Sequence, residues 1–174
     1  LSRKAFFSSG KKPDLIVWSE SSLVVPYKDN EDFYGILPYG DPFTRFLADT
    51  DTSIIVGSPY IDGKKQYNAA YLLSSDGNIV DIYSKIQLVP FAEYIPFIDN
   101  PLVVRFFDKL VGFSSGWNPG TEYKVFGIKN SEGKTVNFTV PICFEDAFPA
   151  VCLNLHNTGS NLLINITNDS WSKT

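Results

Sequence analysis

Short apolar runs rich in β-branched residues recur along the chain, and polar segments containing glycine or proline separate them. Runs of about four to eight such residues are typical of buried β-strands. Two turns join neighbouring runs: 75–77, which contains the hairpin pair Asp76-Gly77, and 130–133. The pattern predicts strands at 14–19, 53–57, 67–74, 78–83, 123–128, 135–142 and 161–167.

Helix signals lie between these runs. Asp41-Pro42 is an N-cap followed by proline, which predicts a helix over 41–48. Further helices are expected at 102–110 and 147–157, and residues 1–12 fit the end of a helix. Residues 21–40 and the remainder of 86–120 read as loop. Strands that alternate with helices and hairpins predict an α/β fold with mixed sheets, in one domain over residues 1–174.

Composition excludes several classes of function. The net charge is −4 and Lys and Arg do not cluster, so no nucleic-acid surface is expected. No run of about 18 apolar residues exists to cross a bilayer. With one histidine and two cysteines, neither a histidine-based metal site nor a disulfide scaffold is expected, and nothing indicates a cofactor.

Three reactive side chains follow three of the predicted strands: Glu20, Lys85 and Cys143. A nucleophilic thiol needs a base, and with a single histidine in the chain a glutamate is the natural candidate. Acyl transfer also needs a cation or hydrogen-bond donors near the developing oxyanion, which suits a lysine. Taken together, the three residues predict acyl-transfer chemistry on Cys143.

Each of these residues also has a structural interpretation. Cys143 fits a small core residue, Glu20 a helix cap, and Lys85 a solvated charge. Glu93 fits a turn cap, and Trp18 fits an ordinary core residue. Only their combination favours a catalytic site.

Four motifs in order resemble the nitrilase (carbon–nitrogen hydrolase) superfamily: V-W-S-E-S, Y-S-K-I-Q-L-V-P-F-A-E-Y-I-P-F, P-I-C-F-E-D and N-D-S-W. The second and the last are similar to those of its apolipoprotein N-acyltransferase branch. The resemblance implies an α-β-β-α sandwich with mixed sheets, of which this chain is an excerpt that is incomplete at both ends.

The resemblance also implies roles for individual residues. Glu20 would be the general base, Lys85 the oxyanion stabiliser and Cys143 the nucleophile. Supporting roles would fall to Glu93, Glu145, Trp18, Phe144 and Trp171. Three positions depart from the family pattern: Ser19 replaces a proline, Ala92 replaces a glycine, and Phe144 replaces a tyrosine and lacks its hydroxyl.

The function implied is the transfer of a fatty acyl chain from a phospholipid, through a Cys143 thioester, to the N-terminal amine of a diacylated lipoprotein. The site would lie on the periplasmic side of a bacterial inner membrane, with flanking membrane helices outside this chain. Two alternatives remain open: a soluble amidase or nitrilase with the same triad, and a non-catalytic binding module. Flanking sequence and the reactivity of Cys143 would discriminate among the three.

Overall fold

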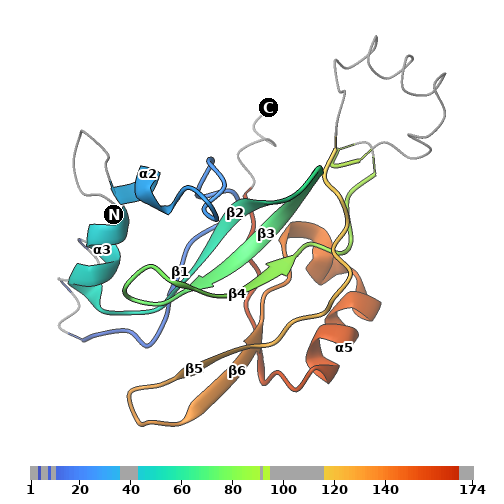
Figure 1. Ribbon diagram of the computed structural model, residues 1–174. Coiled ribbons are helices and arrows are strands. Elements are labelled where there is room, and N and C mark those ends of the chain that lie inside the picture. Colours follow the sequence, from blue (N-terminus) through green and yellow to red (C-terminus); the bar gives the residue numbers. More distant parts are fainter. Residues whose placement is uncertain are drawn as a thin grey trace.

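The computed structural model describes residues 4, 8, 11–35, 43–90, 92–94 and 116–168. These form two sheets, one with strand order β1-β2-β3-β4 and one with order β5-β6-β7 (Figure 1). The strands are β1 Ile16–Val17, β2 Ile54–Asp62, β3 Lys65–Leu73, β4 Ile79–Ser84, β5 Phe126–Lys129, β6 Thr135–Thr139 and β7 Leu162–Leu163. The helices are α2 Glu31–Gly35, α3 Phe43–Thr50, the 3₁₀ turn η1 Cys143–Ala147 and α5 Pro149–Asn157.

Strands β2 and β3 form a long antiparallel pair in the first sheet. In β2, Ile54 and Val56 belong to one core cluster, and Ile55 between them belongs to the other. Successive side chains of a strand point to opposite faces, so this sheet is buried on both sides. That explains why its strands read as continuous apolar runs rather than alternating ones.

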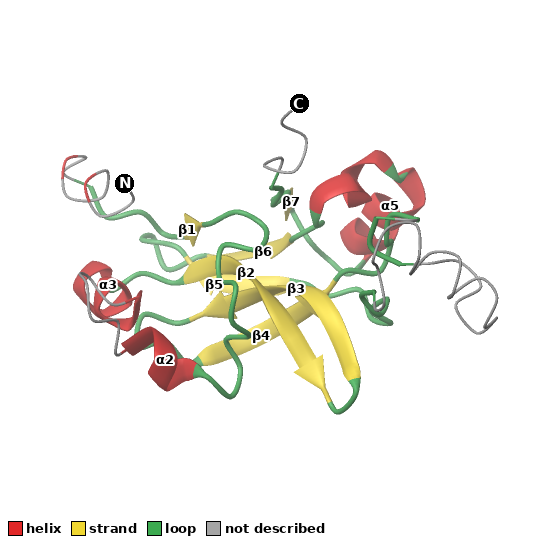
Figure 2. Ribbon diagram, turned by 90° about the horizontal axis from the view of Figure 1, so that it is seen from above, coloured by secondary structure: helices red, strands yellow, loops and turns green. Residues whose placement is uncertain are grey.

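Helices α2 and α3 cover one face of this sheet, and α5 lies at the opposite side of the molecule (Figure 1; Figure 2). Tyr34 of α2 and the buried face of α3 meet the alternate side chains of β2 and β3 there. The residues of this cluster are Leu23, Tyr27, Tyr34, Phe43, Phe46, Leu47, Ile54, Val56, Ala69, Tyr71 and Leu73.

The second sheet contributes to the core on the other face. Phe126 of β5 and Phe138 of β6 pack in one cluster with Ile55 and Tyr83 of the first sheet. Helix α5 adds buried side chains to the same cluster. The expected α/β architecture with mixed sheets is confirmed, because β1 pairs with β2 in parallel while β2, β3 and β4 are antiparallel.

Several predicted boundaries were wrong. Strand β2 continues to Asp62 and forms a hairpin with β3, which begins at Lys65, whereas the prediction ended the strand at residue 57. Helix α2 lies within the predicted loop 21–40, where Glu31 and Asp32 occupy its first turn. Its buried residue, Tyr34, is anchored by a hydrogen bond to the carbonyl oxygen of Val25, a contact that the local pattern does not reveal.

The largest correction falls at the cysteine. The predicted strand 135–142 ends at Thr139, and a 3₁₀ turn that was not predicted begins at Cys143; the predicted helix 147–157 is confirmed as α5, Pro149–Asn157. Pro141 has no N–H to continue a ladder, and Cys143 has a φ of 54°, in the left-handed region. Likewise, the predicted strand 161–167 is reduced to β7, followed by an isolated bridge between Ile166 and Ile142.

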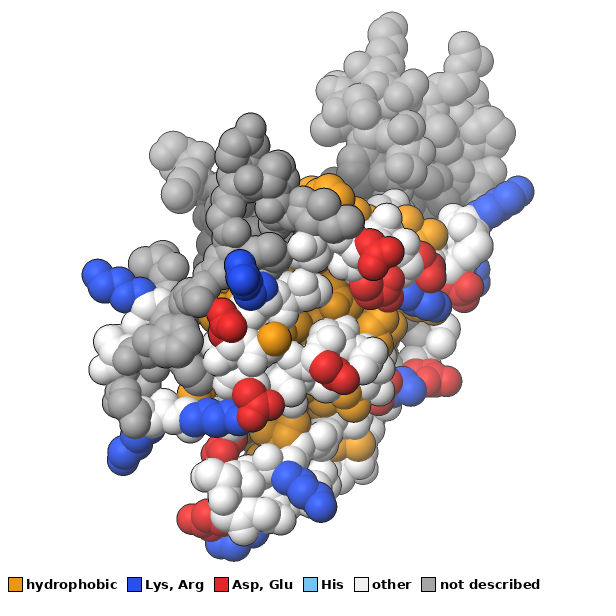
Figure 3. All heavy atoms as spheres, turned by 60° about the vertical axis from the view of Figure 1, so that its left-hand side comes forward, with side chains coloured by type: hydrophobic (Ala, Val, Ile, Leu, Met, Phe, Trp, Pro, Cys, Tyr) orange, Lys and Arg blue, Asp and Glu red, His pale blue; other side chains and the backbone are white. Residues whose placement is uncertain are grey.

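Two further predictions, the helix at 102–110 and most of the helix end before residue 12, lie outside the described residues. Within the described part of the chain, no helix is long and apolar enough to cross a membrane. On the face drawn in Figure 3, acidic and basic side chains are interspersed.

Gly57 of β2 fixes the path of the segment that carries Glu20. A Cβ atom at Gly57 would lie 2.6 Å from the Cα atom of Glu20 and 2.6 Å from the backbone nitrogen of Ser21. Two backbone hydrogen bonds hold the segment in this position: Gly57 N–H donates to Ser19 (3.3 Å) and Leu23 N–H donates to Gly57 (3.0 Å). Only glycine permits this close approach.

We expect Gly57→Ala to lower the free energy of unfolding by about 1–3 kcal/mol, because the new methyl group would force backbone apart. Chemical denaturation would measure the change. Gly127→Ala in β5 is the matched control, since its Cβ would meet chiefly the end of a side chain, Asn137 Oδ1, at 3.3 Å. Equal losses in the two variants would contradict this account.

Candidate active site

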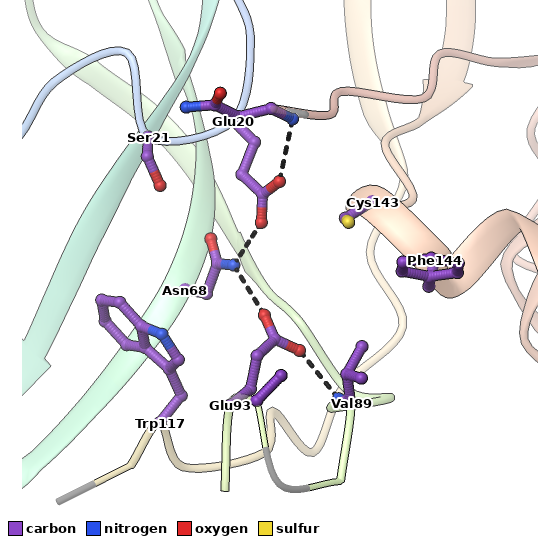
Figure 4. A pocket seen from close by; sticks show the side chains of 10 residues that line it. Glu20, Ser21, Asn68, Val89, Glu93, Trp117, Cys143 and Phe144 are labelled. Atoms are coloured by element: carbon purple, nitrogen blue, oxygen red, sulfur yellow. Dashed lines mark hydrogen bonds between the residues drawn. The ribbon is translucent and has the colours of Figure 1, made fainter. Parts of the chain in front are cut away.

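Two of the three predicted strand ends, Glu20 and Cys143, line one pocket, and the third, Lys85, does not line it but pairs with the lining residue Glu93. Glu20 follows β1, Lys85 follows β4, and Cys143 begins the turn after β6. The pocket has a volume of about 330 Å³, and Figure 4 shows the Glu20 carboxylate and the Cys143 sulfur on facing walls. Its lining residues are Glu20, Ser21, Asn68, Val89, Ala92, Glu93, Trp117, Cys143, Phe144 and Asn168.

The carboxylate of Glu20 is buried and held at both oxygens. Asn68 donates a hydrogen bond from Nδ2 to Oε1 over 2.7 Å. The backbone N–H of Asn168 donates to Oε2 over 3.1 Å. Since only 7% of Glu20 is exposed, these two bonds fix the direction in which the carboxylate points.

Lys85 is fully buried beside the pocket and forms an ion pair with Glu93, with Nζ 2.8 Å from Oε1. The other oxygen of Glu93 accepts the N–H of Val89 over 2.8 Å. Two backbone hydrogen bonds anchor the lysine: its N–H donates to Asn68 (2.8 Å), and Gly120 N–H donates to its carbonyl (2.7 Å). A buried ammonium is stable only when it is paired in this way.

The backbone of Cys143 is held from both sides despite its left-handed conformation. Its N–H donates to Ile166 over 2.8 Å, and Nδ2 of Asn165 donates to its carbonyl oxygen over 3.1 Å. Burial raises the pKa of the thiol, and the negative charge of Glu20 acts in the same direction. A hydrogen bond from the side chain of Thr167 acts in the opposite direction. The net rise in pKa keeps the resting thiol protonated at neutral pH, so it needs a base to react.

Glu145 is fully buried and accepts hydrogen bonds from two separate segments. The backbone N–H groups of Ile86 (2.8 Å) and Gln87 (3.0 Å) donate to its Oε1. The N–H of Ile142 donates to Oε2 over 2.8 Å, and the hydroxyl of Tyr83 reaches both oxygens. Burial raises the pKa of Glu145, while these hydrogen bonds act to lower it.

The contacts of Glu145 therefore join the residues after Lys85 to the residue before Cys143. Its side chain is not among the described residues that line the pocket, whereas the side chain of Glu93 is. The two glutamates differ in position accordingly: Glu93 meets the lysine directly, and Glu145 holds together the backbones that carry the lysine and the cysteine.

The aromatic residues of the prediction occupy different places. Phe144 lines the pocket and is 47% exposed. Trp18 packs against the helical layer, with its ring 5.2 Å from that of Phe43 and 5.6 Å from that of Phe46. Trp171 lies outside the described residues.

Sequence reasoning missed Asn68 and Trp117 as pocket residues. A signal for Asn68 was present, because it is the polar residue in the apolar run Y-N-A-A-Y-L-L of β3. A buried amide must find hydrogen-bond partners, so such a residue marks a polar site within the core. Among the described residues, no group of three or more His, Cys, Asp or Glu side chains could hold a metal ion.

Comparison with known proteins gives a consistent result. Residues 7–174 match the carbon-nitrogen hydrolase family. The chain is 92% identical over 174 residues to "Apolipoprotein N-acyltransferase 2" of Treponema denticola, covering 100% of this chain and 33% of that protein. It is 46% identical over 173 residues to the protein of the same name from Treponema pallidum, covering 96% of this chain and 31% of that protein. The chain thus spans about a third of the length of these curated relatives.

Among solved structures, an amidase from Nesterenkonia sp. superposes with a TM-score of 0.60 at 15% sequence identity, covering 98% of this chain and 58% of that one. A match at this low identity shows a shared fold. The expected nitrilase-like fold is supported by this likeness.

We expect Glu145→Gln to lower the free energy of unfolding by about 2–4 kcal/mol, because the new amide NH₂ group would face a backbone N–H donor such as that of Ile142. Because burial raises the pKa of Glu145, the folded state keeps a proton that the unfolded state has lost only between a pH of about 4.3 and this raised pKa, above which both states are ionised. The stability advantage of the unmodified protein is therefore greatest at low pH and shrinks as the pH rises.

Urea denaturation at a series of pH values would test both the size and the direction of this effect. Glu132→Gln is the matched control, because Glu132 lies in an exposed turn and its carboxylate pairs with the exposed ammonium of Lys134. The interpretation of Glu145 would be wrong if both variants unfolded at the same urea concentration.

Proposed function

Since the chain belongs to the carbon-nitrogen hydrolase family, we propose that Glu20, Lys85 and Cys143 are the catalytic triad of an acyl transfer through a thioester. The observation that carries this proposal is the pocket itself. A buried, oriented carboxylate faces a protonated thiol there, beside a buried ammonium group.

In the first half-reaction, the Glu20 carboxylate accepts the proton of the Cys143 thiol. The resulting thiolate attacks the ester carbonyl of the acyl donor and forms a tetrahedral oxyanion. Lys85 and the backbone N–H of Phe144 stabilise this negative charge. When the C–O bond breaks, Glu20 returns its proton to the leaving alcohol, and the acyl chain remains on sulfur as a thioester.

In the second half-reaction, a primary amine attacks the thioester carbonyl. Glu20 accepts a proton from the attacking nitrogen, and the C–S bond breaks as the amide forms. The proton then passes to the departing thiolate, which restores the Cys143 thiol. The enzyme ends each cycle unchanged, as a two-step transfer requires.

Relatives named apolipoprotein N-acyltransferase at 92% and 46% identity support a lipoprotein acceptor and an acyl donor. We propose more specifically that the donor is a phospholipid and the acceptor is the N-terminal amine of a diacylated lipoprotein. Phe144, Val89 and Trp117 give the pocket an apolar wall that suits an acyl chain. The proposed function implies a site on the periplasmic face of the bacterial inner membrane, with flanking helices outside this chain as the anchor.

An amidase would form the thioester from an amide, breaking the C–N bond and releasing an amine or ammonia, and water would then hydrolyse the thioester. The two activities therefore differ in the acyl donor and in the acceptor, while the roles of the triad stay the same. The high identity to relatives named as acyltransferases favours transfer to an amine.

We expect Cys143→Ala to abolish thioester formation and to lower acyl transfer by on the order of 10³-fold or more, because no other group replaces the nucleophile. The full-length protein would be incubated with a fluorescent phospholipid, and the acyl-enzyme would be detected by its release with neutral hydroxylamine. Cys152→Ala is the control, since Cys152 lies on α5 and is not among the described lining residues. An acyl-enzyme that persists in Cys143→Ala would rule out this mechanism.

We expect Glu20→Gln to slow thioester formation by about 10²–10⁴-fold, the usual contribution of a general base. Because the pKa of Cys143 is raised, the remaining rate should increase as the pH rises and hydroxide begins to remove the thiol proton. The initial rate of acyl-enzyme formation against pH would show this. A rate equal to that of the unmodified protein at neutral pH would assign the role of base to another group.

A further inference from the structure

The amide of Asn68 lies between the two carboxylates of the pocket (Figure 4). Its Nδ2 atom is 2.7 Å from Oε1 of Glu20 and 3.2 Å from Oε1 of Glu93. The residue is 5% exposed and belongs to β3, where it lies opposite Pro59 of β2. A side-chain amide carries two N–H donors, so one nitrogen can serve both carboxylates.

The two carboxylates have different partners. Glu93 pairs with the ammonium of Lys85 and with the N–H of Val89. Within the described part of the chain, Glu20 has no ion pair, and its hydrogen-bond donors are neutral: the amide of Asn68 and the N–H of Asn168.

This difference suits a base. A cation bonded to Glu20 would stabilise the ionised carboxylate strongly and make it a weaker proton acceptor. A neutral amide fixes the position of the carboxylate at a smaller cost to its basicity. It also separates Glu20 from Glu93, whose negative charge would otherwise favour a shared proton between the two.

We propose that Asn68 is a positioning residue for Glu20, which keeps the carboxylate directed at the Cys143 thiol by donating one hydrogen bond to each of the two glutamates. This inference rests on the proposed function, since it concerns the base of that reaction. Asn68 acts through Glu20 and does not itself exchange a proton.

Asn68→Asp tests this role through pH. The substitution keeps the shape of the side chain and replaces its amide donor with a titratable carboxyl group. A protonated aspartic acid can still donate an O–H to Glu20, whereas an ionised one donates nothing and adds a third negative charge. The titratable groups that face this position are Glu20, Glu93, Lys85 and Cys143.

The initial rate of thioester formation would be measured with the full-length protein and a fluorescent phospholipid, at pH values from about 5 to 9. For Asn68→Asp we expect a rate that falls as the pH rises and the new carboxyl group ionises. Relative to the unmodified protein, the loss should grow by about tenfold or more across the range. Asn68→Ala, which has no titratable group, should lose a similar factor at every pH.

Asn137→Asp in β6 is the matched control. It introduces the same charge at a residue that is not among the described residues lining the pocket. It should keep the pH profile of the unmodified protein. Unfolding curves of all variants would separate a loss of stability from a change in chemistry. A loss of stability alone would lower the rate of thioester formation without making that rate fall as the pH rises.

The outcomes distinguish the two proposals. If the unmodified protein forms no thioester, the proposed function fails. If it forms one and Asn68→Asp keeps the same pH profile, the role of Asn68 is wrong while the triad stands. If the rate of thioester formation falls with rising pH in Asn68→Asp but not in Asn68→Ala or Asn137→Asp, the result supports both the proposed function and the role of Asn68.

Discussion

The geometry of the pocket depends on the hydrogen bonds that the buried carboxylate of Glu145 accepts. A charge without access to water is tolerated only when donors surround it, and three backbone N–H groups and one hydroxyl do so here. Two of these N–H groups follow Lys85 in the chain, and the third precedes Cys143. Any shift of the lysine segment relative to the cysteine turn would break charge-assisted hydrogen bonds in the core. The carboxylate therefore fixes the distance between two reactive groups without contacting either.

Gly57 and the left-handed backbone of Cys143 also fix the geometry of the pocket. The backbone beside Glu20 approaches β2 closely enough that any side chain at Gly57 would displace it. At the opposite wall, Cys143 adopts a φ of 54°, which costs a non-glycine residue roughly 1 kcal/mol. Hydrogen bonds to Ile166 and from Asn165 hold it there. Both walls of the pocket are thus set by backbone contacts, and the side chains are carried into position with them.

The charged groups in and beside the pocket have different partners and therefore different roles. Glu93 neutralises the buried ammonium of Lys85, which leaves Glu20 with neutral donors only in the described part of the chain. Burial meanwhile keeps Cys143 protonated at rest. The thiol therefore stays in its less reactive protonated form until a base removes its proton.

The sequence by itself determined where most strands lie, the helices α3 and α5 and the α/β fold class, because apolar periodicity, turn residues and cap residues are local signals, although it missed α2 and several strand ends. It could not place Asn68 between two carboxylates, since its partner Glu20 lies 48 residues away. Nor could it show that Glu145 lies behind the pocket while Trp18 packs against α3, because motif spacing does not say which way a side chain faces. Those positions were decided by the tertiary structure, in which the burial of each polar atom depends on donors supplied by distant segments.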